Sequence, residues 1–416
     1  MTSPLTAPVG DDALAARRSA ATERLGGAAL PAVDEEVWRY SRVGELDLER
    51  WAIPERADGV PDAVESLLSS LGHLAGAVVV RDGSVVATRL DERFVAAGVF
   101  LGAATAHRGG VDALGSVIGD GPDVFTVLND ARGAAPVLVD VPRGVVVDAP
   151  IVVVDWISTA DVAVHPRLVV RLAVDAEATV VEWRGSADVA ALSVPVCEID
   201  VDRAARLRHV VVQDRGPGVW EIATTSARVG VDGSVSVVQA GLGCDYGRSR
   251  VDCRLTGRGA SGDLDAVYFA TGNQTLDYRT FQWHDAPDTT SNLLFKGAVD
   301  DDARSVYTGL IRVEREARGT NAFQTNRNLK LSERAWAESV PNLEIETNDV
   351  RCSHASTVGP IDADQLFYLE SRGVPTETAQ RLIVAGFFDE VLEHVTVPSV
   401  AALVTEAIAR RLGERP

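Results

Sequence analysis

Short apolar runs rich in β-branched residues recur along the chain from about residue 121 to residue 350. Clusters of Gly, Pro and Asp separate the runs, and no helical periodicity of useful length interrupts them. This spacing predicts β-strands joined by turns and excludes a sheet of alternating strands and helices. A sandwich, a barrel and a solenoid all remain compatible with it, and no crisp repeat is visible. The clearest runs are residues 137–139, 144–147, 151–154, 168–172, 179–183, 208–212 and 234–238.

The two ends of the chain show helical patterns in addition to predicted strands. Residues 11–26 are rich in alanine and 60–71 are amphipathic, so both are predicted helices, and short strands are predicted within 76–100. Near the C-terminus, helices are predicted to open at Asp362, Pro375 and Pro398. These patterns predict three domains, which are an N-terminal α/β region (1–120), a β core (121–358) and a C-terminal helical lobe (359–416).

Charge and composition narrow the classes of partner. The chain has 416 residues and a net charge of −20, from 40 basic and 60 acidic residues. Such a surface argues against nucleic acid and anionic membrane, since both are polyanions. No signal peptide and no apolar stretch long enough to cross a membrane are recognisable. Four cysteines are too few for a disulfide scaffold in a chain of this length, so we expect a cytoplasmic protein.

Candidate metal ligands lie in the alternating segment that contains Cys352 and His354. On a strand these two side chains point to the same face, roughly 7 Å apart along the chain. A thiolate beside an imidazole suits iron, zinc or copper. A buried cysteine that acts as a small hydrophobic residue is the alternative for Cys352.

Other polar residues are better explained by structure than by ligand binding. Asn321, Gln324, Asn326 and Asn328 alternate with other residues, which predicts hydrogen-bonded amides inside the fold. His284 is likewise expected to be a hydrogen-bonded structural histidine. The segment 36–40, EVWRY, is expected to anchor the N-terminal region to its neighbour through its aromatic side chains.

The sequences CSHASTVG (352–359) and DADQLFYLESRG (362–373) resemble the C-terminal signature of the SufB/SufD family, scaffolds of the SUF iron–sulfur cluster assembly system. The Cys-Ser-His order is most like the SufD branch, although Ala355-Ser356 replaces the usual Gly-Ala. The resemblance is dense from about residue 265 to 395 and diffuse before that. Further matching positions are His284, Pro287, Thr289, Ser291, Lys296-Gly297, Ser305-Val306-Tyr307-Thr308-Gly309 and 324–329.

The resemblance implies a fold and a role. It implies a mainly β protein with a right-handed parallel β-helix core, which pairs with a SufB-like scaffold subunit and docks a SufC-like ABC ATPase through its C-terminal lobe. His354, with Cys352, would face the partner and bind iron or a transient iron–sulfur cluster at the subunit interface.

Further expectations and alternatives accompany this role. No G-x-x-x-x-G-K-[ST] loop is present, so the chain is not expected to hydrolyse ATP or to be an enzyme. Alternatives are a SufB-like scaffold that carries the nascent cluster itself, and a β-helix carbohydrate-active enzyme. Without a partner, a homodimer is a further alternative.

Overall fold

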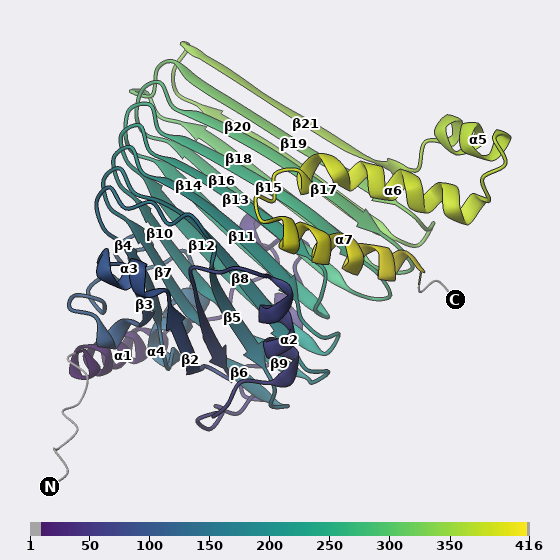
Figure 1. Ribbon diagram of the computed structural model, residues 1–416. Coiled ribbons are helices and arrows are strands. Elements are labelled where there is room, and N and C mark those ends of the chain that lie inside the picture. The colour runs from purple at the N-terminus through teal and green to yellow at the C-terminus, as the bar shows by residue number, and fades with distance from the viewer. Residues whose placement is uncertain (1–9, 414–416) are drawn as a thin grey trace, which may run out of the picture.

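The computed structural model describes residues 10–413. Two long, mostly parallel sheets face each other and form a β-solenoid of about eight turns between residues 137 and 360. Figure 1 shows the coils stacked side by side, with the N-terminal elements at one end and the C-terminal helices against one face. The mainly β fold with an N-terminal α/β region and C-terminal helices is therefore confirmed.

From residue 196 onward, successive strands of the solenoid alternate between the two sheets, so each coil there contributes one strand to each sheet. In spatial order, the ten-stranded sheet comprises β2 (Ser84–Leu90), β1 (Gly76–Arg81), β5 (Ile151–Ile157), β8 (Glu177–Ser186), β11 (Arg206–Asp214), β13 (Ser234–Gly241), β15 (Ser261–Ala270), β17 (Thr290–Val299), β19 (Thr320–Lys330) and β21 (Val350–Pro360). The main path of the eleven-stranded sheet comprises β20 (Trp336–Ile345), β18 (Arg304–Val313), β16 (Thr275–His284), β14 (Tyr246–Leu255), β12 (Val219–Val229), β10 (Val196–Val201), β7 (Arg167–Leu172), β4 (Val137–Val141) and β3 (Phe100–Ala103), with β6 (Val162–Val164) and β9 (Ala191–Ser193) beside it.

One corner of the solenoid repeats the same backbone conformation in coil after coil. At this corner a residue with positive φ recurs at intervals of about thirty residues. The backbone N–H of each such residue donates to a backbone carbonyl in the next coil, at 2.7–3.2 Å, and that carbonyl belongs to the residue just before the equivalent corner position. The stacked corners thereby satisfy each other's backbone groups and hold the coils in register. The positions are Asp175, Ala204, Asp232, Gly259, Asp288 and Gly319.

The interior between the sheets is divided into an apolar part and a polar part. Where β8 and β11 begin, they send apolar side chains such as Ala178, Val180 and Leu207 into the main core. Further along the same faces lie Glu182, Arg184 and other charged or amide residues, all buried. Because strand side chains alternate with period two, the charged residues stay on the inner face that the apolar residues share.

The N-terminal elements dock onto the solenoid. Trp38 is buried under the guanidinium of Arg248, 3.8 Å from the ring centroid, and the Arg279 side chain donates to the Arg39 carbonyl at 2.6 Å. The ring of Tyr40 packs on that of Trp336, so the predicted anchoring role of segment 36–40 is confirmed. The elements of this region are α1 (Asp11–Leu25), the 3-10 helices η1 (Glu36–Trp38), η2 (Val43–Glu45) and η3 (Ala104–Ala106), α2 (Asp62–Ser70), α3 (Glu92–Ala96) and α4 (Val124–Arg132).

The C-terminal helices are α5 (Ala363–Ser371), α6 (Thr376–Leu392) and α7 (Pro398–Gly413). Apolar residues of α6 and α7, including Phe388 and Val404, pack on the outer face of the ten-stranded sheet. The Lys296 ammonium on β17 donates to the Phe387 carbonyl at 2.8 Å and pairs with Glu390 at 2.5 Å. By contrast, α5 buries none of its residues and projects beyond the sheet (Figure 1).

Two local predictions differ from the structure. Helix α4 lies inside the range that the sequence pattern assigned to strands alone, with Phe125 and Leu128 buried beside Trp38. Residues 144–147 form a turn with one isolated bridge instead of a strand, because Gly144 adopts φ +70°. The division into three domains at residues 120 and 358 stays a prediction. No helix between residues 10 and 413 combines the length and the hydropathy needed to cross a membrane.

Candidate functional site

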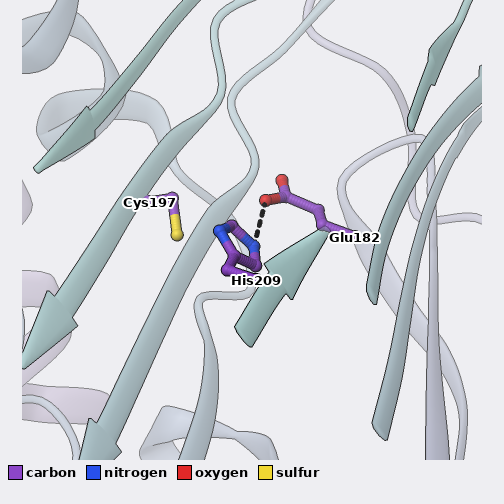
Figure 2. Close-up of side chains that lie close together, drawn as sticks. All are labelled: Glu182, Cys197 and His209. Carbon is purple, nitrogen blue, oxygen red and sulfur yellow. Dashed lines mark ion pairs between the residues drawn. The ribbon is translucent and has the colours of Figure 1, made fainter. Parts of the chain in front are cut away.

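Three metal-ligating side chains meet inside the solenoid. Glu182 comes from β8 and His209 from the neighbouring strand β11, whereas Cys197 lies across the interior on β10. Figure 2 shows the three side chains close together, with the ion pair between His209 and Glu182 drawn as a dashed line. One donor atom from each residue lies within 4.8 Å of the other two, and all three residues are buried. We call this group the interior cluster.

The donor atoms of the interior cluster lack ordinary partners. His209 is completely buried, and neither of its ring nitrogens makes a hydrogen bond with the described residues. Its Nε2 lies 3.3 Å from Oε2 of Glu182, but outside hydrogen-bonding geometry, and that oxygen has no hydrogen-bond donor either. Buried polar atoms are rarely left unpaired in proteins, so these atoms are candidate ligands for a shared cation.

Glu182 is also the end of a buried chain of ion pairs. Its Oε1 accepts from Arg184 at 2.7 Å, Arg184 reaches Glu221 at 3.3 Å, and Arg215 joins Glu221 to Asp155. Burial by itself favours the protonated form of Glu182, but Arg184 and the adjacent His209 outweigh burial and lower the pKa of Glu182 to about 2. Glu182 is therefore ionised at neutral pH. A cavity of about 20 Å³ borders Arg184 and Glu221.

Cys197 is a protonated thiol in the absence of a cation. Burial raises the pKa of Cys197 well above its ordinary value, and the negative charge of Glu182 raises it further. A thiolate, an imidazole nitrogen and a carboxylate oxygen together suit a borderline divalent metal such as zinc or iron. The three donor atoms of the interior cluster lie close enough together to bind one metal ion.

The structure places Cys352 and His354 on β21, the last strand of the ten-stranded sheet. They pair in register with Ala322 and Gln324 of β19, two residues apart on the same face. Cys352 is half-buried against Ile311 and Val313, and burial raises the pKa of its thiol, whereas His354 is exposed. The role of either residue as a metal ligand stays a prediction.

The two strands β20 and β21, which we call the C-terminal edge, end their sheets side by side. Ser356 of β21 donates to Ser339 of β20 at 2.8 Å, and residues of both strands are half-buried or exposed. Within residues 10–413, no third His, Cys, Asp or Glu joins Cys352 and His354 in one metal-sized group. A metal held there has no third ligand of these four residue types from the described part of the chain.

The buried amides and His284 have structural surroundings. Asn326 donates to the Tyr268 hydroxyl at 3.0 Å, that hydroxyl donates to Asn328 at 2.7 Å, and Gln324 donates to the Tyr307 hydroxyl at 2.7 Å. Asn328 also donates to Asn326 at 2.7 Å, so the buried amides bond both to tyrosines and to each other, as predicted. His284 is buried between the hydroxyls of two residues, Thr289 at 2.8 Å and Ser291 at 2.9 Å.

Sequence patterns did not identify the interior cluster. Glu182 lies within an apolar run and His209 comes directly before one, which is the one available signal. A charged residue on the inner face of a predicted strand needs a buried partner. Which partner it finds depends on strand register and on the opposite sheet, and neither is visible in the sequence.

The protein-family model described as "SUF system FeS cluster assembly, SufBD core domain" matches residues 156–387 of the chain. An iron–sulfur cluster assembly SufBD family protein of Mycobacterium tuberculosis is 41% identical over 223 residues, which cover 52% of this chain and 56% of the relative. SufD of Escherichia coli is 31% identical over 214 residues, 51% of each chain. The chain thus spans about half the length of these relatives. A SufBD family protein of Synechocystis aligns over 96% of this chain and 92% of its own length, at 25% identity.

Proposed function

Because the chain belongs to the SufBD family of the SUF iron–sulfur cluster assembly system, we propose that it is a SufD-like, non-catalytic scaffold subunit that works in the cytoplasm. The similarity to SufD of Escherichia coli and the Cys352-Ser353-His354 sequence favour SufD over SufB. The observation that carries the proposal is the C-terminal edge, where two candidate ligands for iron lie on β21, the last strand of its sheet.

The first proposed partner is a SufB-like scaffold subunit, which pairs with the C-terminal edge. An unpaired strand presents a row of backbone donors and acceptors that an additional strand can satisfy. In this chain two such strands lie side by side at one end of the solenoid, which gives a broad surface for a second solenoid. In the absence of that partner, the same surface allows two copies of this chain to form a homodimer.

The second proposed partner is a SufC-like ABC ATPase, which docks on α5 and the adjoining part of α6. Three large apolar side chains are exposed there, Phe367 at 70%, Tyr368 at 56% and Leu382 at 54%. Exposed aromatic residues are enriched in protein interfaces relative to the rest of the surface. Since α5 buries none of its residues against the solenoid, it is free to pack on another protein. ATP hydrolysis then belongs to the partner.

The cargo of this assembly is iron or a nascent iron–sulfur cluster at the interface between the two scaffolds. His354 and Cys352 supply an imidazole and a thiol from this chain, and both suit iron. Residues 10–413 offer no third His, Cys, Asp or Glu there, which supports a coordination completed by the SufB-like partner. Cluster handling at this position therefore depends on both subunits.

The proposal is tested by co-expressing the tagged chain with a SufB-like scaffold and a SufC-like ATPase and purifying the complex without nucleotide. We expect the wild-type chain to retain both partners. The double variant Phe367→Ala/Tyr368→Ala should lose the ATPase and keep the scaffold. Ile53→Ala, which removes another exposed apolar side chain (69%), is the matched control and should keep both. Loss of neither partner in the double variant contradicts the docking surface.

A second variant tests the cargo site in the same complex. His354→Ala should leave both partners bound but lower the iron content and the visible absorption of the complex after reconstitution. His73→Ala, at another exposed histidine, is the control and should change neither. If the isolated chain assembles a full iron–sulfur chromophore without a partner, the SufB-like alternative replaces the SufD-like role.

A further inference from the structure

The buried ion pairs around the interior cluster carry an unbalanced charge. The five linked residues are three carboxylates and two guanidinium groups, which leaves one excess negative charge when all are ionised. An uncompensated charge inside a protein is costly, because the interior solvates it poorly. A proton, a bound cation, or the excess positive charge of Arg248 and Arg279, which share Asp277 and of which Arg248 borders the same cavity, can balance the group. Its members are Asp155, Glu182, Glu221, Arg184 and Arg215.

A proton balances the charge but leaves the geometry unexplained. A proton on Asp155 brings the total to zero. Nε2 of His209 and Oε2 of Glu182 then still lie 3.3 Å apart outside hydrogen-bonding geometry, beside the Sγ atom of Cys197. A single positive centre between the three donor atoms satisfies the carboxylate, the imidazole and the sulfur at once.

We propose that Glu182, Cys197 and His209 bind one borderline divalent transition-metal ion, Zn²⁺ or Fe²⁺, inside the solenoid. On binding, the thiol of Cys197 releases its proton and coordinates as a thiolate. The two positive charges of the ion then cancel the thiolate and the excess carboxylate charge, so the buried group becomes neutral. Hard cations such as Mg²⁺ and Ca²⁺ are disfavoured, since they prefer oxygen ligands only.

This site is separate from the candidate ligands at the C-terminal edge. In the ten-stranded sheet, five strand-to-strand steps lead from β11, which carries His209, to β21, which carries His354. Strands lie about 4.8 Å apart, so the two positions are roughly 24 Å from each other. One ion therefore cannot bind to both sites at once. The ligands of either site can be substituted without changing those of the other.

The experiment uses Co²⁺ as a spectroscopic probe for Zn²⁺ or Fe²⁺. The full chain carries Cys352→Ser, so that the thiol at the C-terminal edge cannot contribute, and it is refolded with Co²⁺ because the interior cluster is closed in the native fold. After dialysis against metal-free buffer, we expect one cobalt per chain and a thiolate-to-cobalt charge-transfer band. Cys197→Ser and His209→Leu should lose both.

Cys253→Ser is the matched control, because Cys253 is equally buried in the solenoid but lies outside the interior cluster. It should keep the cobalt and the band. A band that survives Cys197→Ser, or the absence of cobalt from the Cys352→Ser parent, overturns the proposal. If Cys197→Ser fails to fold by circular dichroism, X-ray absorption of the zinc-loaded parent decides. One sulfur at about 2.3 Å with nitrogen or oxygen at about 2.0–2.2 Å supports the site, and a shell without sulfur refutes it.

Discussion

Replacing His284 by Gln should weaken the pH dependence of the protein's stability. His284 ends β16, where its two ring nitrogens lie between the hydroxyls of Thr289 and Ser291. A neutral imidazole has one donor and one acceptor, and both hydroxyls can match them. Burial lowers the pKa of His284 from 6.5 to about 4, because the charged form is poorly solvated there. The unfolded chain therefore binds a proton at this residue more readily than the folded chain.

The sign and size of the effect follow from proton linkage. Since the pKa is lower in the folded state, the contribution of His284 to stability is complete above pH 6.5 and is lost as the pH falls toward 4. The full difference corresponds to about 3.4 kcal/mol, at 1.36 kcal/mol per pKa unit. Between pH 7.5 and pH 5 the free energy of unfolding should fall by about 2 kcal/mol through this residue alone.

The assay is denaturant unfolding at pH 7.5, 6 and 5, followed by circular dichroism. Gln keeps a donor and an acceptor but does not titrate, so His284→Gln should lose about 2 kcal/mol less than wild type between pH 7.5 and pH 5. His73→Gln, at an exposed histidine, is the control and should follow the wild type. Parallel pH curves for His284→Gln and wild type would refute the reasoning, since burial would then not have shifted this pKa.

Three further substitutions test other parts of the fold. Ala204→Gly should raise the free energy of unfolding by about 1 kcal/mol, because Ala204 adopts φ +55°, where only Gly is free of strain. Arg215→Met should lower it by about 3–5 kcal/mol, since Asp155 and Glu221 lose a buried partner; an effect below about 1 kcal/mol contradicts this. Lys296→Met should speed amide hydrogen exchange in α6 but not in α1, because α6 loses its contacts with the ammonium group.

The strands were predictable from the sequence, but the way they stack was not. Apolar runs between turn residues predicted strands such as β5, β8, β11 and β13, because both are local properties of the chain. The repeat that defines the solenoid is conformational, and its equivalent positions are occupied by Asp175, Ala204 and Gly259 among others. Three different residue types adopt the same backbone conformation at these positions, so the amino-acid sequence shows no repeat. The choice of a β-helix rested on the family resemblance.

The two sets of candidate ligands also differ in whether the sequence alone can predict that they lie close together. Cys352 and His354 share a face because they are two residues apart on one strand, and period-two alternation predicted that relation. Glu182, Cys197 and His209 come from three strands in two sheets. Their meeting depends on register across the sheet and on the packing of one sheet against the other, so no local pattern predicts it.

The two ends of the solenoid differ, and this difference limits how large an assembly can grow through them. At the N-terminal end both sheets finish with antiparallel strands, β2 and β3, and Phe94 of α3 is buried in the core beside them. At the other end the coils stop on the parallel strands β20 and β21. Head-to-tail stacking would therefore join a parallel coil to an antiparallel one, whereas joining two parallel ends would bring equivalent surfaces together. In the pairing proposed above each molecule uses its single parallel end, so that pairing joins two molecules.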